Sequence, residues 1–402
     1  MLDDRILQLI RERLPEITEL RRDLHRHPEL KFQESRTSNV IRQVLERSGI
    51  EIRAGVAKTG ILGTLKGTAN PSTGSGRGGR VIALRADMDA LPMEEKTGKP
   101  YASENKGVHH ACGHDGHVAT LLGAAVVLAQ VRDRIPGTVR FVFQPAEEGG
   151  FGGKMMVDEG ALDNPAAGMT FALHSWPFLD AGKIGLRKGT IMASTDSFRI
   201  TVLGRGGHGA YPHKCVDPIL VGAKIVDNLQ AVVSREKNPV EPAVVTIGKF
   251  HSGTATNVIP DDALLEGTIR TLSEETRKAI HDGIRRVCES TAAAFRARAT
   301  FELTEGYPST VNHDVAVDLL DKVGRDVLGP QSIHWLPEAS MGGEDFAFYL
   351  QKVPGAMFRL GVGANRPALH SSDFDFEDAA LEPGMKVYCG LVLQYLGDGG
   401  SK

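Results

Sequence analysis

Apolar and polar residues follow two regular patterns in the first half of the chain. One is the helical spacing i, i+3, i+4, i+7, which the segment 117–131 shows at Val118, Leu121, Leu122 and Ala125. The other consists of short β-type runs that end in polar residues, namely "RVIALRADMD" (80–89), "GTVRFVFQPAEEGG" (137–150) and "MTFALHSWP" (169–177). This alternation predicts an α/β sheet with helices on both faces.

The pattern changes after about residue 190. Phe198, Ile200 and Val202 alternate with polar residues as in a half-buried strand, and the order over 190–305 is strand, helix, strand, strand, helix, strand. This is the order of the ferredoxin-like motif. We therefore predict that a ferredoxin-like domain, residues 190–305, is inserted into a larger α/β domain made of residues 1–189 and 306–402.

Composition narrows the class of protein. The 402 residues are 41% hydrophobic and 24% charged with a net charge of -3. These values are typical of a globular protein and give no electrostatic basis for binding nucleic acid or an anionic membrane. The N-terminal 25 residues predict an amphipathic helix without the apolar core of a signal peptide. Four widely spaced cysteines favour a reducing compartment, so the cytosol is the expected location.

Residues capable of binding metal recur after the predicted strands. They fall in five clusters, which are Asp87 with Asp89, the segment 112–117, Glu147 with Glu148, His174, and His370. Each cluster alone has an ordinary structural explanation, such as a turn, a helix cap or a solvated helix start. Because ligands bind outside the carboxyl ends of strands in open α/β sheets, the recurrence predicts one metal site at that edge.

The segment "HHACGHDGH" (109–117) is the densest of these clusters. Cys112 and His114 are two positions apart, so they share a side in an extended loop but not on a helix. Asp115 is expected to cap a helix that begins near His117. His109 and His110 receive no role from the pattern.

Taken in order, the motifs resemble those of one known family. They are "RRDLHRHPEL", "ALRADMDALPMEE", "HACGHDGHVATLLGAA", "QPAEEGGFGG", "ALHSWP", "GRGGHGAYPH", "TATNVIPD", "GGEDFA" and "LHSSDF". The chain resembles the M20-type metallopeptidase and amidohydrolase superfamily, in its branch of hippurate hydrolases, N-acyl-amino-acid amidohydrolases and auxin-conjugate hydrolases. The resemblance implies a mixed-sheet metallohydrolase catalytic domain with an inserted ferredoxin-like α+β lid and dimerisation domain.

The resemblance also implies two divalent metal ions, with Cys112 bridging them. The implied ligands are Cys112, His114, Glu148, His174 and His370. The broader superfamily has a histidine ligand where this chain has Arg85, which stays protonated and cannot ligate a cation. Asp87 is then expected to orient a ligand imidazole. A thiolate with imidazoles and a carboxylate favours Zn²⁺, and Mn²⁺, Co²⁺ or Ni²⁺ are the alternatives known among related enzymes.

Further roles follow from the resemblance. Glu147 is the implied general base, and it can face inward beside Glu148 if both lie in a turn with Gly149 and Gly150. His208 is implied to stabilise the oxyanion in the other subunit's active site, although the bare pattern also fits a turn residue. The implied contacts to the substrate carboxylate are Asn257 and Arg270, with backbone donors at Gly342 and Gly343.

These features predict hydrolysis of the amide bond of N-acyl-amino acids, of the hippurate type, releasing a carboxylic acid and a free amino acid. The alternatives are a metal-dependent dipeptidase or carboxypeptidase and a non-catalytic metal-binding protein. A homodimer through the inserted domain is expected, with a tetramer as the alternative. The preferred acyl group and amino acid depend on the shape of the pocket, which the sequence does not give.

Overall fold

The computed structural model describes residues 2–69 and 79–397 and divides the chain into two compact units. Unit 1 is Met1–Gly189, Val311–Glu338 and Asp345–Lys402, and unit 2 is Thr190–Thr310 and Ala339–Glu344. Unit 2 includes residues 306–310 and 339–344, which the sequence pattern placed in the larger domain. Hydrogen bonds explain the difference: Thr195 N donates to Tyr307 O over 2.9 Å, and Ala193 N lies 3.0 Å from Ser340 O.

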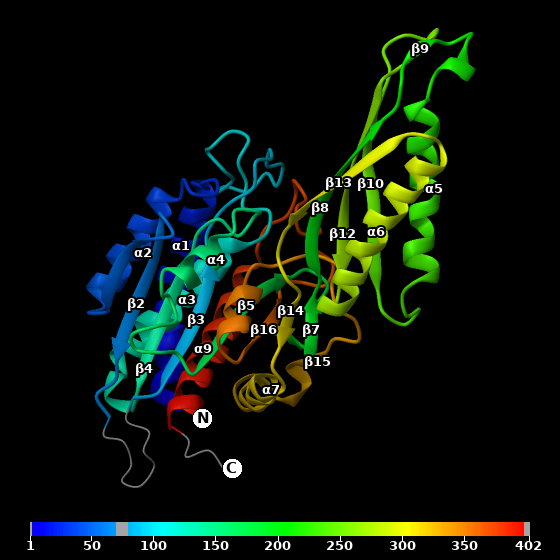
Figure 1. The fold of residues 1–402 in the computed structure, drawn as a ribbon. Coiled ribbons are helices and arrows are strands. Elements are labelled where there is room, and N and C mark those ends of the chain that lie inside the picture. Colours follow the sequence, from blue (N-terminus) through cyan, green and yellow to red (C-terminus); the bar gives the residue numbers. More distant parts are fainter. Residues whose placement is uncertain (1, 70–78, 398–402) are drawn as a thin grey trace. The chain divides into compact units, whose positions relative to one another are not determined.

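Unit 1 is built on an eight-stranded mixed sheet (Figure 1). Across the sheet the strands are β1 (Glu51–Val56), β2 (Gly60–Lys66), β4 (Thr138–Gln144), β3 (Val81–Asp87), β5 (Met169–Trp176), β16 (Gly355–Gly361), β6 (Ile184–Leu186) and β15 (Ile333–Trp335). The neighbours β4, β3, β5 and β16 run parallel to one another. Their carboxyl ends therefore meet at one edge of the sheet, where the sequence predicted the metal site.

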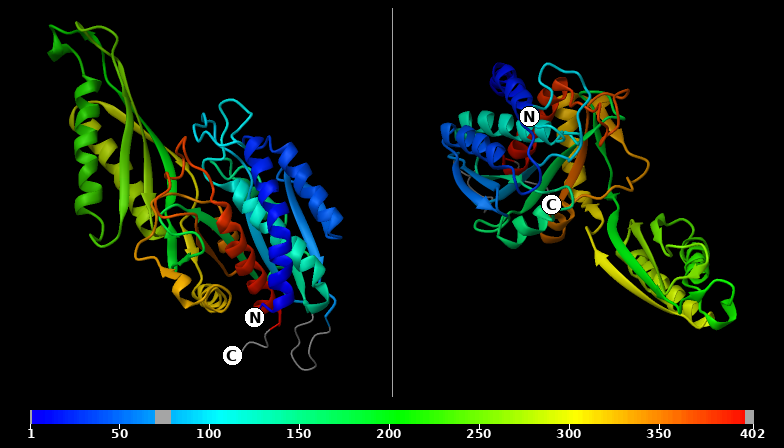
Figure 2. Two further views of the ribbon diagram at one scale, coloured as in Figure 1. Left: turned by 180° about the vertical axis from the view of Figure 1, so that it is seen from behind. Right: turned by 90° about the horizontal axis from the view of Figure 1, so that it is seen from above.

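Helices cover both faces of this sheet. They are α1 (Asp4–Arg26), α2 (Ser35–Arg47), α3 (His114–Gln130), α4 (Gly152–Asp158), α7 (Asp314–Leu328), α8 (Ala347–Lys352) and α9 (Leu381–Gly397). On one face α1, α3 and α9 pack together over β3 (Figure 2), while α4 and α8 contact each other, β4 and β16. Among the residues described, no helix is both long and apolar enough to cross a membrane.

The buried strands explain the apolar runs in the sequence. All seven residues of β3 and of β16 are buried, as expected for central strands covered on both faces. The predicted helical positions Val118, Leu121 and Leu122 of α3 lie in the main core. The packing of these helices on a mixed sheet confirms the predicted fold class.

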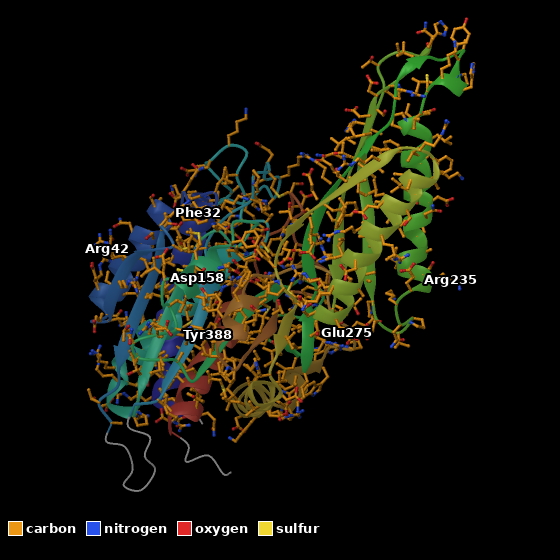
Figure 3. The ribbon with its side chains drawn as sticks, in the orientation of Figure 1. Phe32, Arg42, Asp158, Arg235, Glu275 and Tyr388 are labelled. Carbon is orange, nitrogen blue, oxygen red and sulfur yellow. The ribbon has the colours of Figure 1, made fainter. Side chains whose placement is uncertain are left out.

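Unit 2 contains a four-stranded antiparallel sheet with two helices. The sheet order is β10 (Ala243–His251), β12 (Asp262–Thr271), β8 (Ser194–Leu203) and β13 (Arg298–Glu305), and the helices are α5 (Pro218–Arg235) and α6 (Glu274–Ala294). This strand order is that of the ferredoxin-like motif. Figure 3 marks Arg235 at the end of α5 and Glu275 in the first turn of α6. A short pair, β9 (Gly207–His208) and β11 (Val258–Ile259), extends beyond the sheet.

Candidate metal centre

Side chains from four separate segments of unit 1 meet at the carboxyl edge of the sheet. Their ligand atoms form overlapping groups in which all atoms lie within 4.8 Å of one another. One group is Cys112, His114 and His174, the second is Cys112, Glu148 and His370, and the third is His114, Glu147 and Glu148. The structure thus brings together all five implied ligands and the implied base, and Cys112 is common to two of the groups.

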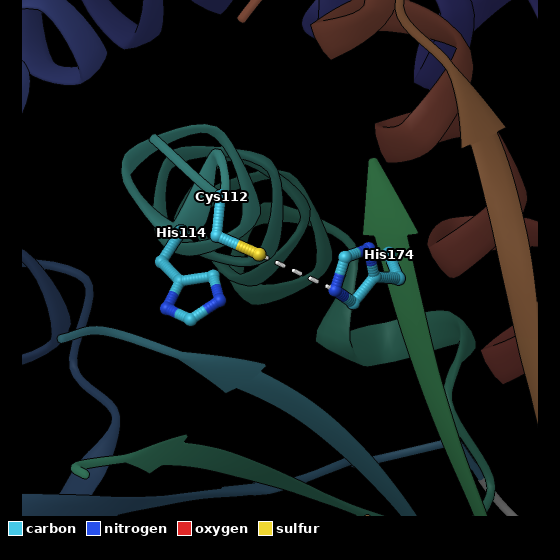
Figure 4. A group of neighbouring side chains, drawn as sticks. All are labelled: Cys112, His114 and His174. Carbon is cyan, nitrogen blue, oxygen red and sulfur yellow. Dashed lines mark hydrogen bonds between the residues drawn. The ribbon is translucent and has the colours of Figure 1, made fainter. Parts of the chain in front are cut away.

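The spacing of these atoms suits a bound cation. Cys112 Sγ lies 3.6 Å from His174 Nε2 (Figure 4), and His370 Nε2 lies 3.2 Å from Glu148 Oε1. Two ligands of one tetrahedral zinc ion lie about 3.3 Å apart when they are N and O, and about 3.6 Å apart when they are S and N. The donor set, with one thiol, imidazoles and carboxylates, therefore fits divalent metal ions.

Backbone carbonyls fix the orientation of two of the imidazoles. His114 Nδ1 lies 2.8 Å from Asp89 O, and His174 Nδ1 lies 2.9 Å from Ser175 O. In the neutral ring, each Nδ1 therefore carries the proton and each Nε2 keeps its lone pair. The Nε2 of His114 is buried and makes no hydrogen bond, which is the arrangement expected of a nitrogen that ligates a metal.

The protonation of the ligands differs from what metal binding requires. Burial raises the pKa of the Cys112 thiol to about 12. Burial disfavours a charged His114, but the Asp87 carboxylate outweighs it and raises the pKa of His114. Burial and the neighbouring Arg359 lower the pKa of His174. Without a cation, Cys112 is a neutral thiol, so metal binding must release its proton.

Asp87 contacts a histidine that the resemblance left without a role. Its Oδ1 accepts a hydrogen bond from His117 Nδ1 over 2.6 Å, and its Oδ2 lies 3.6 Å from His114 Nε2. The other ring nitrogen of His117 accepts a hydrogen bond from Ser175 N over 2.8 Å. Both nitrogens of His117 are thus occupied, so this residue ties Asp87 to the end of β5.

Arg85 occupies the position of the missing histidine ligand. Its guanidinium is fully buried, donates to Asp87 Oδ2 over 2.7 Å and lies 3.1 Å from Asp345 Oδ1. It also donates to Gln144 Oε1 over 2.9 Å. Arg85 therefore supplies a fixed positive charge next to Asp87. It has no lone pair to offer a metal ion, so it does not replace the histidine as a ligand.

Glu147 and Glu148 lie in a turn after β4, as the sequence predicted. The turn begins with Ala146 at a φ of 54° and continues through Gly149 at a φ of 73°. Such backbone angles are costly for alanine, so surrounding contacts must hold the turn in place. Glu147 is buried, with 6% of its surface exposed, whereas His370 has 54% of its side chain exposed.

The start of α3 corrects one prediction. The helix begins at His114, not near His117, and Gly113 at a φ of 87° precedes it. Asp115 does not cap the helix, because its carboxylate faces Arg21 at 3.2 Å and His25 at 2.8 Å. His109 and His110 are buried and make no side-chain hydrogen bond.

The implied substrate-binding residues all belong to unit 2 and form two groups. Arg270 pairs with Thr195 in the sheet, and a Cβ on Gly343 would lie 2.1 Å from Thr195 Cγ2. Gly342, next to Gly343, donates its N–H to Ser340 Oγ over 3.2 Å, and a Cβ on it would lie 3.3 Å from Met192 Cε. Burial lowers the pKa of Arg270, whose guanidinium donates to Ile269 O.

His208 and Asn257 form the second group, around β9 and β11. Gly209 N donates to Asn257 O over 2.8 Å, and His208 pairs with Val258. His208 is exposed, and its Nδ1 accepts a hydrogen bond from Ala210 N. The eight residue steps from Asp262 to Arg270 in β12 span about 26 Å. Within one chain, the structure therefore does not bring His208 and Asn257 to Arg270.

Comparison with known proteins places this fold and site in one class. The model of "Peptidase family M20/M25/M40" matches residues 83–394, and the chain belongs to this family. With the donor set described above, it is a metal-dependent amidohydrolase. This confirms the family, fold class and enzyme class that the sequence motifs predicted.

Three relatives align along nearly the whole chain. N-acetylcysteine deacetylase of Bacillus subtilis is 41% identical over 375 residues, covering 93% of this chain and 95% of the relative. Hippurate hydrolase of Campylobacter jejuni is 38% identical over 381 residues, covering 95% and 97%. Thermostable carboxypeptidase 1 of Saccharolobus solfataricus is 38% identical over 387 residues, covering 94% and 95%.

A solved structure shows the same architecture. A Bacillus subtilis protein described as a dinuclear metal binding peptidase from the M20 family aligns with a TM-score of 0.83 and 36% identity. The alignment covers 96% of this chain and 99% of that chain.

Proposed function

We propose that this enzyme hydrolyses the amide bond of N-acyl-amino acids with the help of two divalent ions. The observation that carries the proposal is the position of Glu147, whose carboxylate lies within 4.8 Å of the ligand atoms of His114 and Glu148. A general base must lie within hydrogen-bond reach of the attacking water, and a carboxylate beside the ligand atoms meets this requirement for a water held by the metals. Relatives named N-acetylcysteine deacetylase and hippurate hydrolase support the substrate class.

The chain's residues divide the work as follows. The residues that would hold the two ions are Cys112, His114, Glu148, His174 and His370, and Zn²⁺ is the expected ion. When bound, two such ions polarise the amide carbonyl and lower the pKa of water. Glu147 takes the proton of the attacking water at its carboxylate and delivers it to the leaving amine nitrogen.

The substrate carboxylate is the feature that the residues of unit 2 recognise. Arg270 binds it through its guanidinium and Asn257 through its amide, with backbone donors at Gly342 and Gly343. His208 stabilises the oxyanion in the site of a second subunit. The separation of His208 and Asn257 from Arg270 along β12 supports a homodimer in which the two copies each complete the other's site. The four free cysteines support a cytosolic location.

A carboxypeptidase or dipeptidase is the second candidate, because a 38% identical relative is named a carboxypeptidase. One panel of substrates separates the two functions: hippurate, N-acetyl-amino acids and dipeptides with a free amino group, each with Zn²⁺, Mn²⁺ or a chelator. We expect metal-dependent turnover of the N-acyl compounds at least tenfold above that of the dipeptides. The opposite preference would overturn the proposal and establish the second candidate.

A further inference from the structure

Two buried carboxylates hold three consecutive backbone amides in the turn that carries Glu147 and Glu148. Ala146 N donates to Glu34 Oε1 over 2.9 Å. Glu147 N donates to Asp89 Oδ1 over 2.9 Å, and Glu148 N donates to Asp89 Oδ2 over 3.0 Å. Both carboxylates are at most 1% exposed, so no solvent competes for these amides.

Asp89 also orients a histidine of the metal centre. Its backbone carbonyl accepts the hydrogen bond from His114 Nδ1, 2.8 Å away, which leaves His114 Nε2 with a free lone pair. One residue therefore contacts the backbone of the proposed base, the backbone of the proposed ligand Glu148 and the ring of the proposed ligand His114. A displacement of Asp89 would move all three.

We infer that Asp89 is a positioning residue, whose two carboxylate oxygens set the places of Glu147 and Glu148 in the centre through their backbone amides. The inference rests on the proposed function, since it concerns the roles proposed there for these two residues. The need for it arises from the turn itself, because Ala146 has a φ of 54°, which alanine rarely adopts.

The chemistry of the two carboxylates predicts opposite responses to the same substitution. Both oxygens of Asp89 face N–H donors, so Asp89→Asn directs an NH₂ group at the amide of Glu147 or Glu148 and leaves one amide without an acceptor. Glu34 differs, since its Oε2 accepts from the Thr59 hydroxyl over 2.6 Å. A hydroxyl can also accept, so Glu34→Gln keeps both hydrogen bonds.

Burial raises the pKa of Glu34, which makes its replacement by a neutral amide still easier. Glu34→Gln is thus the matched control: a buried acid that holds the same turn is replaced by its amide, yet the hydrogen bonds survive. A second variant, Asp89→Glu, retains the charge but moves the oxygens by about one C–C bond. This variant shows whether metal binding and turnover depend on the position of the carboxylate or only on its charge.

The experiment compares the full-length wild-type protein with Asp89→Asn, Asp89→Glu and Glu34→Gln. Metal-free samples are titrated with Co²⁺, and the thiolate-to-cobalt and d–d absorption bands report each ion bound. Turnover of N-acetyl-amino acids and hippurate is measured in parallel, and circular dichroism of the metal-free samples reports folding.

We expect wild type and Glu34→Gln each to bind two Co²⁺ ions, and the affinities and the kcat values of the two proteins should agree within about threefold. Asp89→Asn and Asp89→Glu should bind the second ion at least tenfold more weakly and lose at least 100-fold in kcat, with KM changed less than fivefold. Wild-type metal binding and kcat in both Asp89 variants would overturn the inference, and so would equal losses in Glu34→Gln.

If Asp89→Asn does not fold, Asp89→Glu decides between the same outcomes. Failure of the proposed function is a separate result. If wild type turns over none of the N-acyl substrates, the proposed activity is wrong, whereas the Co²⁺ titrations still show whether Asp89 positions Glu148 as a ligand.

Discussion

The sulfur of Cys112 lies 3.6 Å from Nε2 of His174, although 62 positions separate the two residues. Ser175, the neighbour of His174, maintains this approach. Its hydroxyl donates to Cys112 O over 2.7 Å, and Gly113 leaves room for it, since a Cβ there would lie 2.8 Å from the Ser175 oxygen. These contacts hold the loop before α3 against the end of β5. The thiol of Cys112 therefore lies beside His174 and also beside Glu148 and His370, which come from two further segments.

Replacing the shared thiol tests the centre most directly. In Cys112→Ser we expect the loss of at least one of the two ions, because serine supplies no thiolate. The free energy of unfolding of the metal-free variant should lie within about 1 kcal/mol of that of metal-free wild type. Metal content by mass spectrometry and denaturation of metal-free samples measure the two effects. Cys389→Ser is the matched control, since this buried cysteine lies in α9 in the main core, and it should retain both ions.

Metal binding should strengthen as the pH rises. Burial places the pKa of the Cys112 thiol at about 12, so this ligand carries a proton near neutral pH. Each proton displaced by the ion makes the apparent affinity rise about tenfold per pH unit. Zn²⁺ competition titrations between pH 6 and 8 measure the slope, and a slope of zero would contradict protonated ligands.

Glu147→Gln should separate chemistry from metal binding. The amide cannot take a proton from water, so we expect kcat to fall by about 10² to 10⁴, with two ions still bound. Glu148→Gln is the comparison, and it should lose metal together with activity, because its side chain is a proposed ligand. Turnover and metal content of both variants are measured, and an active Glu147→Gln would exclude this residue as the base.

The central sheet and the groups of metal-capable residues that follow its strands could be predicted from the sequence, because both depend on local patterns. Fully buried strands such as β3 appear in the sequence as nearly continuous apolar runs, which a short segment is enough to show. The position of each metal-capable residue just after a strand was enough to predict that they meet at one edge.

Contacts between distant segments could not be predicted in this way. The helix was expected to begin near His117 because Asp115 looked like a cap, but His25, 90 positions away, takes up its carboxylate. The pairing of Asp87 with His117 and the role of Asp89 depend likewise on contacts across 25 or more positions. No local pattern carries such information.

Mixing two inactive variants tests whether His208 acts in the site of the partner. We expect His208→Ala alone to lose about 10² to 10³ in kcat, the effect of removing one oxyanion donor. Mixed with Glu147→Gln under conditions of subunit exchange, random dimers should regain about a quarter of wild-type activity, because half are heterodimers with one complete site. Activity assays before and after exchange measure the gain, and no recovery would place His208 in its own subunit's site or outside catalysis.

His25 should make the stability of the enzyme depend on pH. Its Nδ1 lies 2.8 Å from Asp115 and its Nε2 lies 3.3 Å from Glu95. Burial disfavours the imidazolium, but these carboxylates outweigh it and raise the pKa of His25 to about 9. Because the pKa is higher in the folded state, the stabilisation is complete below pH 6.5 and is lost as the pH rises through about 9.

We therefore expect the free energy of unfolding of wild type, relative to His25→Asn, to fall by about 3 kcal/mol between pH 6.5 and 9.5. Denaturant titrations at several pH values measure this difference, in which the titration of groups that do not interact with His25 cancels. His213→Asn serves as the control, because His213 is exposed and its replacement should leave the curve parallel to that of wild type. If the curve for His25→Asn were parallel to that of wild type, His25 would not be an imidazolium between Asp115 and Glu95, and the prediction would be wrong.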